Sequence, residues 1–157
     1  MTRFRVAGEE DVERVLALQR RYYAEDGYPF STGEARGVLA RFVTDPALGR
    51  LWWIEEAKRT AGYLALTFGY SLEYRGRDAF VDELYLLPEH RGRGLGRAAI
   101  AFAESEARAL GVRAIHLEVE RAKDAAKSIY RRAGFVDHDR HLMTRALYER
   151  PSDEPGR

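Results

Sequence analysis

The sequence predicts an α/β domain built on a mixed sheet. Runs typical of strands dominate the middle of the chain, runs with helical spacing lie between and around them, and a glycine-rich turn at 89–97 joins a strand to a helix. The 157 residues suffice for one domain with its own core. We assign residues 1–150 to that domain and residues 151–157, a proline-containing end with little to bury, to a flexible tail.

The first half of the chain is expected to contain one strand, two helices and two strands. Gly27-Tyr28-Pro29 separates the helices, because glycine and proline interrupt helical backbone. Ser31 and Glu34 have the spacing of a capping box and predict the start of the second helix, which Asp45-Pro46 ends. The predicted order is a strand at 3–6, a helix from 12, a helix from 31, and strands at 51–55 and 62–68 joined by a polar turn at 57–60.

The second half is expected to alternate strands with helices. Gly111 and Gly134 stand where a helix end favours left-handed backbone. We predict a strand at 79–87, helices at 95–110 and 124–133, a strand at 113–119 between them, and one or two short strands near 135–137 and 142–147. The complete predicted order is β-α-α-β-β-β-α-β-α-β-β.

Composition excludes several classes of protein. The 26 basic and 25 acidic side chains leave a net charge of +1, so we expect no nucleic acid and no membrane as partner. The absence of cysteine excludes disulfides, thiolate metal sites and a cysteine nucleophile, and it fits a cytoplasmic location. We find no signal peptide and no apolar run long enough to span a membrane. The four histidines lack ligand spacing, so no metal is expected.

The turn at 89–97 predicts an anion site. Glycines at 92, 94 and 96 let the backbone approach a ligand, and the helix that follows directs the positive end of its dipole to the same place. The alternative is a glycine-rich turn surrounded by solvated arginines. The G-x-G-x-G spacing differs from the dinucleotide fingerprint and lacks the Lys-Ser/Thr of a Walker loop, so both of those sites are disfavoured.

Two segments resemble motifs of the GNAT N-acetyltransferases. LYLLPEHRGRGLG at 84–96 looks like motif A, because Arg91, Gly94 and Gly96 match its Arg/Gln-x-x-Gly-x-Gly/Ala core. LEVERAKDAAKSIYRRAGF at 117–135 looks like motif B, with its tyrosine followed by Gly-Phe. Lys123 stands where motif B often has asparagine, and a lysine there could reach a phosphate.

The resemblance implies a mostly antiparallel sheet flanked by helices, with acetyl-CoA as cofactor. In the family the turn's amides hold the pyrophosphate of the coenzyme. This role carries over to Arg91, Gly92, Arg93, Gly94, Leu95, Gly96 and Arg97. The preceding strand binds the pantetheine arm through its backbone, and the matching residues are Leu84, Tyr85 and Leu86. In the family a bulge splays this strand from the next one.

The resemblance also suggests the catalytic groups. Tyr130 matches the general acid that protonates the leaving thiolate, and the alternative is a packed aromatic side chain. The base is open among Asp82, Glu83 and Glu118. Without a bulge, Asp82 and Glu83 face opposite sides of the sheet; we prefer Glu83, whose alternative is a strand carboxylate paired with an arginine. His116 is interpreted as a polar face residue of its strand.

Acids and aromatic residues gather in the segments that line the acceptor cleft in related enzymes. We propose Glu25, Asp26, Tyr28 and Phe30 as substrate residues; Glu73, Asp78, Tyr22, Tyr23 and Tyr70 are further candidates. Each could equally be a solvated charge or a packed ring. Together they favour a cationic acceptor, such as a polyamine-like or aminoglycoside-like amine, over an acidic one.

The predicted activity is direct acetyl transfer to a primary amine in a ternary complex, because no cysteine is present to carry an acyl group. The alternatives are a non-catalytic sensor that binds coenzyme A, an acetyltransferase acting on protein N-termini or lysines, and an unrelated nucleotide-binding domain. Homodimerisation is common in the family and is also expected.

Overall fold

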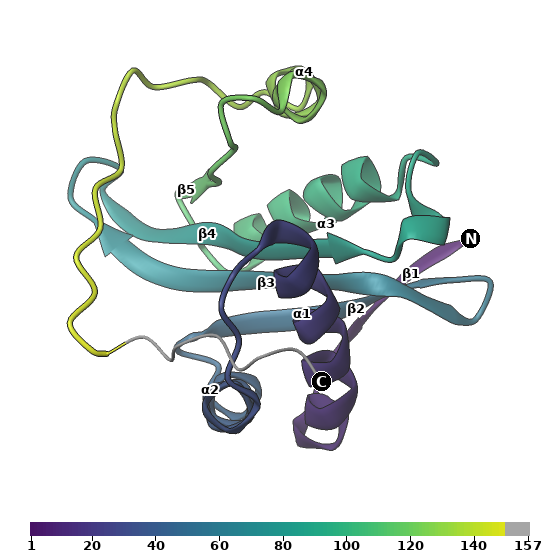
Figure 1. The fold of residues 1–157 in the computed structure, drawn as a ribbon. Coiled ribbons are helices and arrows are strands. Elements are labelled where there is room, and N and C mark those ends of the chain that lie inside the picture. The colour runs from purple at the N-terminus through teal and green to yellow at the C-terminus, as the bar shows by residue number, and fades with distance from the viewer. Residues whose placement is uncertain (150–157) are drawn as a thin grey trace.

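The computed structural model describes residues 1–149, so the predicted tail at 151–157 lies outside the described residues. A sheet with the strand order β1-β2-β3-β4-β5 runs through the middle of the molecule (Figure 1). β1 to β4 pair antiparallel and β5 pairs parallel with β4, which confirms the mixed, mostly antiparallel sheet. The strands are β1 Thr2–Val6, β2 Gly49–Glu56, β3 Arg59–Ser71, β4 Gly76–Leu86 and β5 Ala114–His116; the α-helices are α1 Val12–Asp26, α2 Thr32–Thr44, α3 Leu95–Ala109 and α4 Asp124–Arg132; short 3-10 turns lie at Glu9–Asp11 and Pro88–His90.

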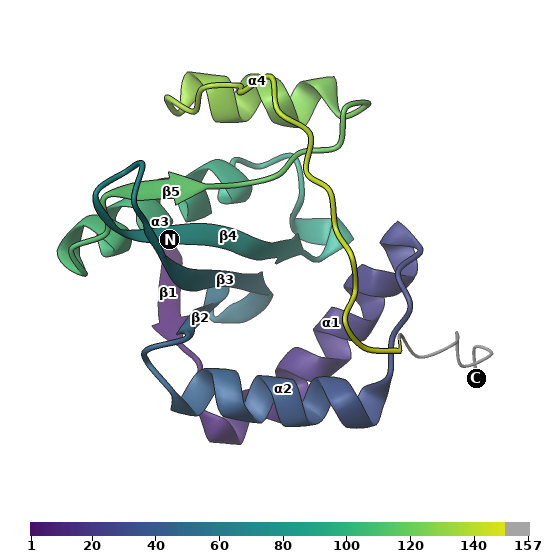
Figure 2. The ribbon, with the colours of Figure 1, turned by 90° about the vertical axis from the view of Figure 1, so that its left-hand side faces the viewer.

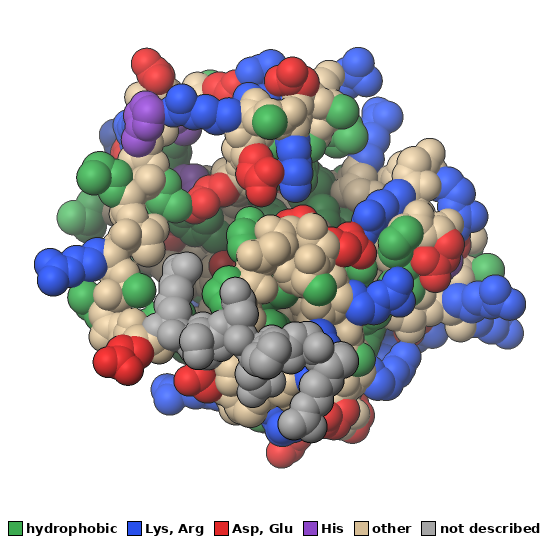
Figure 3. All heavy atoms as spheres, viewed as in Figure 1, with side chains coloured by type: hydrophobic (Ala, Val, Ile, Leu, Met, Phe, Trp, Pro, Cys, Tyr) green, Lys and Arg blue, Asp and Glu red, His purple; other side chains and the backbone are tan. Residues whose placement is uncertain are grey.

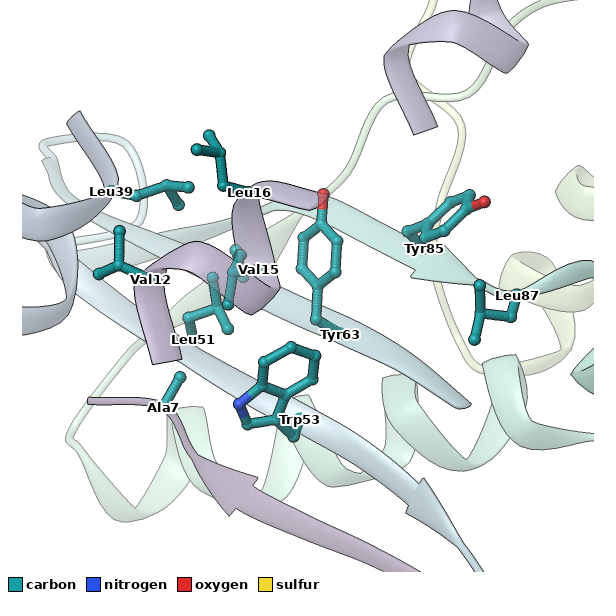
Figure 4. Packing of buried hydrophobic residues seen from close by; sticks show 11 residues of the cluster. Ala7, Val12, Val15, Leu16, Leu39, Leu51, Trp53, Tyr63, Tyr85 and Leu87 are labelled. Atoms are coloured by element: carbon teal, nitrogen blue, oxygen red, sulfur yellow. The ribbon is translucent and has the colours of Figure 1, made fainter. Parts of the chain in front are cut away.

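Helices cover both faces of the sheet. α1 and α2 lie on one face, and α3 and α4 lie on the other (Figures 1 and 2). Successive strand residues point to opposite faces, so Trp53 packs under α1 while its neighbour Trp52 packs under α3. In the first cluster, α1 places Val15 and Leu16 against the sheet near Tyr63 (Figure 4). Replacing a buried tryptophan such as Trp52 or Trp53 by alanine costs about 3–5 kcal/mol, so α1 and α3 are fixed firmly to the sheet.

The helices begin and end at the residues predicted to start and stop them, and one predicted capping contact is not formed. α1 ends at Gly27, whose φ of 71° is left-handed and whose N–H bonds the carbonyl of Tyr23. α2 begins after Ser31 as predicted, but the Ser31 side chain makes no capping bond. The capping box is therefore wrong as a contact, although its position marks the helix start correctly.

The strands differ from the prediction in length and number. β2 and β3 are longer than predicted, because their hairpin turns within Ala57 and Lys58, both at positive φ, rather than over four residues. β5 is shorter than the predicted 113–119. The predicted strands near 135–137 and 142–147 are not formed: residues 133–149 contain no strand, and most of their side chains are exposed. This segment runs from α4 past the sheet toward α2 (Figures 1 and 2). Its alternating side chains have no sheet face to pack against, so the strand pattern does not lead to a strand.

Candidate active site

β4 carries an extra residue in its middle. Ala65 of β3 pairs with Glu83, but the next residue, Leu66, pairs with Val81, so Asp82 has no partner on β3. Val81 therefore packs on the α3 face, while Asp82 and Glu83 both line one pocket near α1. The alternation that would separate these two carboxylates is broken by this bulge.

The edge of β4 that faces β5 is open beyond the bulge. β5 pairs with β4 only across Asp78–Phe80 and then diverges. Leu87 donates its N–H to Ala61 of β3 at 2.8 Å. Backbone groups alternate along a strand, so the backbone of Tyr85 faces β3 and those of Leu84 and Leu86 face the opening. Of the three predicted pantetheine contacts, Leu84 directs its N–H and carbonyl into the opening, and Leu86 directs its N–H there while its carbonyl accepts a hydrogen bond from Arg91 Nε at 2.9 Å.

A pocket of about 490 Å³ occupies this opening and is called the β4 pocket. Its lining brings together twelve of the predicted site residues: Asp82, Leu84, Tyr85, Leu86, Arg91, Gly96, Glu118, Lys123, Tyr130, Glu25, Asp26 and Tyr28. Gly92, Arg93, Gly94, Leu95 and Arg97 do not line it, and Phe30 and Glu83 line neighbouring pockets. The residues predicted from separate parts of the sequence thus converge between β4, α4 and the end of α1.

The glycine-rich turn has the backbone of an anion cradle. Gly92 and Gly94 have φ values of 72° and 82°, which favour glycine. Gly94 is the N-cap of α3, and no other atom lies within 4 Å of the place where its Cβ would be. The buried side chain of Leu95 anchors the first turn of α3 to the core. The N–H groups at this helix start are free to bind phosphate oxygens.

Two arginines of the turn are engaged within the chain. Arg91 forms an ion pair with Glu25 (Nη2–Oε2, 2.7 Å) and donates from Nε to the carbonyl of Leu86. Glu25 also accepts a hydrogen bond from the Tyr85 hydroxyl at 2.7 Å, and these two partners lower the pKa of Glu25. Arg93 pairs with Glu56. Glu25 was predicted to attract substrate, but in this structure its carboxylate is paired with Arg91.

Glu83 is a buried carboxylate with one free oxygen. The residue is only 8% exposed to solvent. Oε1 accepts hydrogen bonds from Gln19 Nε2 at 2.8 Å and from the Tyr63 hydroxyl at 3.3 Å. Oε2 is buried and has no hydrogen-bond partner within the described chain. Burial, reinforced by the charge of Asp82, raises the pKa of Glu83. A carboxylate with a raised pKa and one oxygen that has no hydrogen-bond partner suits proton transfer.

Glu83 faces a pocket of about 280 Å³, the acidic pocket, which adjoins the β4 pocket. It is lined by Tyr22, Tyr23, Tyr28, Phe80, Val81, Asp82, Glu83 and Glu118. Five of these residues, including Asp82 and Glu118, also line the β4 pocket. Asp82 reaches solvent, yet the protein atoms crowded around its carboxyl raise its pKa. Figure 3 shows acidic side chains in a hollow between the α4 and α1 sides of this face.

Tyr130 and His116 occupy different settings. Tyr130 on α4 is half-buried, lines the β4 pocket and contacts the Phe135 ring edge-on. Desolvation raises the pKa of its phenol. His116 lies outside both pockets, with Nε2 at 3.2 Å from Asp78 and its ring against Tyr74. Tyr130 is thus placed to meet a ligand, whereas His116 is a partnered side chain of β5.

Sequence reasoning missed the two residues that hold Glu83. Tyr63 is fully buried in β3 and is indistinguishable by pattern from a core aromatic residue. Gln19 lies one helical turn after Val15 and Leu16 on the buried stripe of α1, so a polar residue on an apolar face was the available signal.

Comparisons with known proteins agree with this arrangement. The profile described as "Acetyltransferase (GNAT) family" matches residues 12–135. An uncharacterised N-acetyltransferase of Bacillus subtilis, YycN, is 30% identical over 83% of this chain and 89% of its own length. An integron cassette protein from the mobile metagenome of Cole Harbour Salt Marsh is 35% identical, with a TM-score of 0.83 over 94% of this chain and 91% of that one.

A more distant crystal structure shares the fold. It is a Clostridium acetobutylicum protein described as a predicted acetyltransferase with acetyl-CoA, 20% identical, with a TM-score of 0.76 over 92% of this chain and 96% of that one. Within residues 1–149, no helix is long and apolar enough to cross a membrane. The same residues contain no group of three potential ligand side chains that could hold a metal ion.

Proposed function

The chain belongs to the GNAT family of acetyltransferases, and from that premise we propose that it acetylates the primary amine of a small cationic acceptor. Family members are acetyl-CoA-dependent. The observation that carries the choice of acceptor is the group of three carboxylates, Asp82, Glu83 and Glu118, that lines the acidic pocket beside the open edge of β4. Carboxylates without a basic neighbour in the lining attract and orient an ammonium group.

The residues of the turn and of β4 fit the coenzyme. The glycine turn and the start of α3 offer N–H groups to a pyrophosphate, and Arg91 can exchange Glu25 for a phosphate oxygen. The backbone groups of Leu84 and the N–H of Leu86, which face the opening, can bind an extended amide arm as an added strand would. When bound, acetyl-CoA supplies the thioester whose acetyl group is transferred.

Each side chain then has a defined task. Glu83 Oε2, directly or through water, accepts the proton that the acceptor ammonium must lose before it can attack. The N–H of Leu84, directed into the opening, stabilises negative charge on the carbonyl oxygen. The hydroxyl of Tyr130 donates a proton to the departing thiolate. Holding both substrates in adjoining pockets supplies much of the rate.

The test is calorimetric titration of the protein with acetyl-CoA, compared with Gly94→Glu and Gly111→Glu. Both glycines have positive φ and open space around the Cβ position, so both substitutions strain the backbone alike. We expect micromolar binding by the wild type and Gly111→Glu, and loss in Gly94→Glu, because only Gly94 lies at the turn. Equal binding by both variants would exclude the turn as the coenzyme site.

Release of free thiol in the presence of small amines then separates catalysis from binding. We expect release that depends on the amine, since the acidic pocket adjoins the β4 pocket. Binding of acetyl-CoA without thiol release for any amine would favour a coenzyme sensor over a transferase.

A further inference from the structure

A third pocket adjoins the acidic pocket on its α2 side and is called the aromatic pocket. It measures about 420 Å³, and its walls include Phe30 and Val38 together with Tyr23 and Tyr28. Tyr23 and Tyr28 also line the acidic pocket, so the two spaces meet at these rings. The rings are mutually braced: Tyr23 packs edge-on against Tyr28 at 5.8 Å and against Phe30 at 5.5 Å. A molecule whose amine occupies the acidic pocket can therefore extend its remainder between aromatic walls.

The two pockets differ in charge. The acidic pocket has three carboxylates and no Lys, Arg or His in its lining. The aromatic pocket has one carboxylate, Glu34, which lies on the exposed side of α2. The guanidinium of Arg20 lies over the Phe30 ring at 5.8 Å from its centre. A second ammonium beside the Phe30 ring would therefore meet the positive charge of Arg20.

The hydrogen bond between Gln19 and Glu83 separates the two spaces chemically. Glu83 lines the acidic pocket and Gln19 lines the aromatic pocket, and each has one buried side-chain oxygen without a hydrogen-bond partner in the described chain. A hydrogen bond from an ammonium group to a carboxylate is stronger than one to a neutral amide oxygen. The negatively charged side chains are thus concentrated in the acidic pocket, with only Glu34 in the aromatic pocket.

Resting on the proposed function, we propose that the acceptor is a monocation with an apolar body the size of an aromatic ring. Its ammonium lies against Glu83 and Asp82 in the acidic pocket, and its body lies between Phe30 and Val38 in the aromatic pocket. This narrows the acceptor class away from polyamine-like and aminoglycoside-like molecules, whose further ammonium groups would find only the exposed carboxylate of Glu34 in the aromatic pocket.

The test compares kcat/KM for 2-phenylethylamine, ethylamine and 1,4-diaminobutane with acetyl-CoA as donor. Ethylamine carries the same ammonium and two carbons without the ring, and diaminobutane replaces the apolar body with a second charge. We expect 2-phenylethylamine to exceed both by roughly tenfold, chiefly through a lower KM, because burying its ring gains binding energy in a hydrophobic pocket.

Val38→Glu introduces a negative charge into the aromatic pocket at a position that is 69% exposed and therefore tolerant. We expect it to reverse the preference between 2-phenylethylamine and diaminobutane. The matched control is Leu72→Glu, the same change of charge at an 88% exposed residue outside all three pockets. It should leave the wild-type ratio intact.

The outcomes separate this inference from the activity it rests on. Rates within about threefold for all three amines, or a wild-type preference for diaminobutane, would overturn the monocation proposal and leave amine acetylation standing. A ratio that shifts equally in Val38→Glu and Leu72→Glu would also overturn it. If acetyl-CoA binds but none of the amines is acetylated, both proposals fail together.

Discussion

Glu83 ionises less readily in the folded chain than in water, because burial disfavours its charged form. The folded state consequently holds this proton more tightly than the unfolded chain does. The contribution of Glu83 to stability is complete below the usual glutamate pKa of 4.5 and is lost as the pH rises through the higher folded pKa. Above that folded pKa the ionised group therefore costs the protein stability while it offers a proton acceptor.

Glu83→Gln should consequently separate stability from activity. We expect kcat to fall by about 10²–10⁴-fold, the usual contribution of a general base. We also expect a higher Tm than wild type at pH 8, with a difference that shrinks as the pH approaches 4.5. Thiol-release kinetics and thermal melts measure the two effects. The control is Asp82→Asn, for which we expect a much smaller loss; an equal or larger loss would move the base to Asp82.

Residue identity alone indicated the acids but not their partners. Asp82, Glu83 and Glu118 could be proposed from the sequence because they fall on strands next to the motif. The contacts that distinguish them come from distant positions: Gln19 is 64 residues away from Glu83 and Tyr63 is 20 residues away. Such long-range contacts depend on how α1 packs on the sheet, and no local pattern encodes that packing.

The bulge is the element that creates the site. β4 last pairs with β5 at Phe80, two residues before Asp82, and a bulge bends its strand and increases the local twist. Without the opening, the backbone of Leu84 and Leu86 would have a strand partner and the β4 pocket would close. The residues around Asp82 show no pattern that predicts a bulge, and only the resemblance to the GNAT family implied one.

Removal of Asp82 should test this role. The deletion leaves Val81 opposite Leu66 and Glu83 opposite Ala65, so each remaining side chain keeps its face. We expect a cooperative thermal transition near that of the wild type, but acetyl-CoA affinity lower by roughly tenfold or more as β4 straightens against β5. Asp82→Ala keeps the extra residue and removes only the carboxylate, so it should retain coenzyme affinity. Full affinity in the deletion variant would show that the opening does not depend on the bulge.

For the whole molecule, local patterns predicted the elements up to α3 and also α4 closely, but not the strands after α3. Helix and strand periodicity, with Gly27 and Gly111 at helix ends, located the elements to within a few residues. After His116 the chain leaves the sheet although Leu117 and Val119 continue the strand pattern. A strand needs a partner as well as alternation, and tertiary pairing decides where β5 ends.

The exposed segment after α4 leads us to expect a homodimer. Val136, Leu142, Met143 and Leu147 are each more than 70% exposed. β5 pairs with β4 on one side, and its other edge pairs with no strand of residues 1–149. Exposed apolar side chains beside an open strand edge are typical of an association surface. Light scattering after gel filtration should give twice the chain mass; a monomer at micromolar concentration would contradict this expectation.

The sheet order β1-β2-β3-β4-β5 repeats the order of the strands along the chain. Each strand therefore docks beside one that has already been synthesised, and no strand has to wait for a later one to be inserted between it and its neighbour. Two long hairpin pairings, β2 with β3 and β3 with β4, join segments that are close in sequence. Such a topology keeps loop-closure costs low, so the chain can assemble progressively from its N-terminus as it leaves the ribosome.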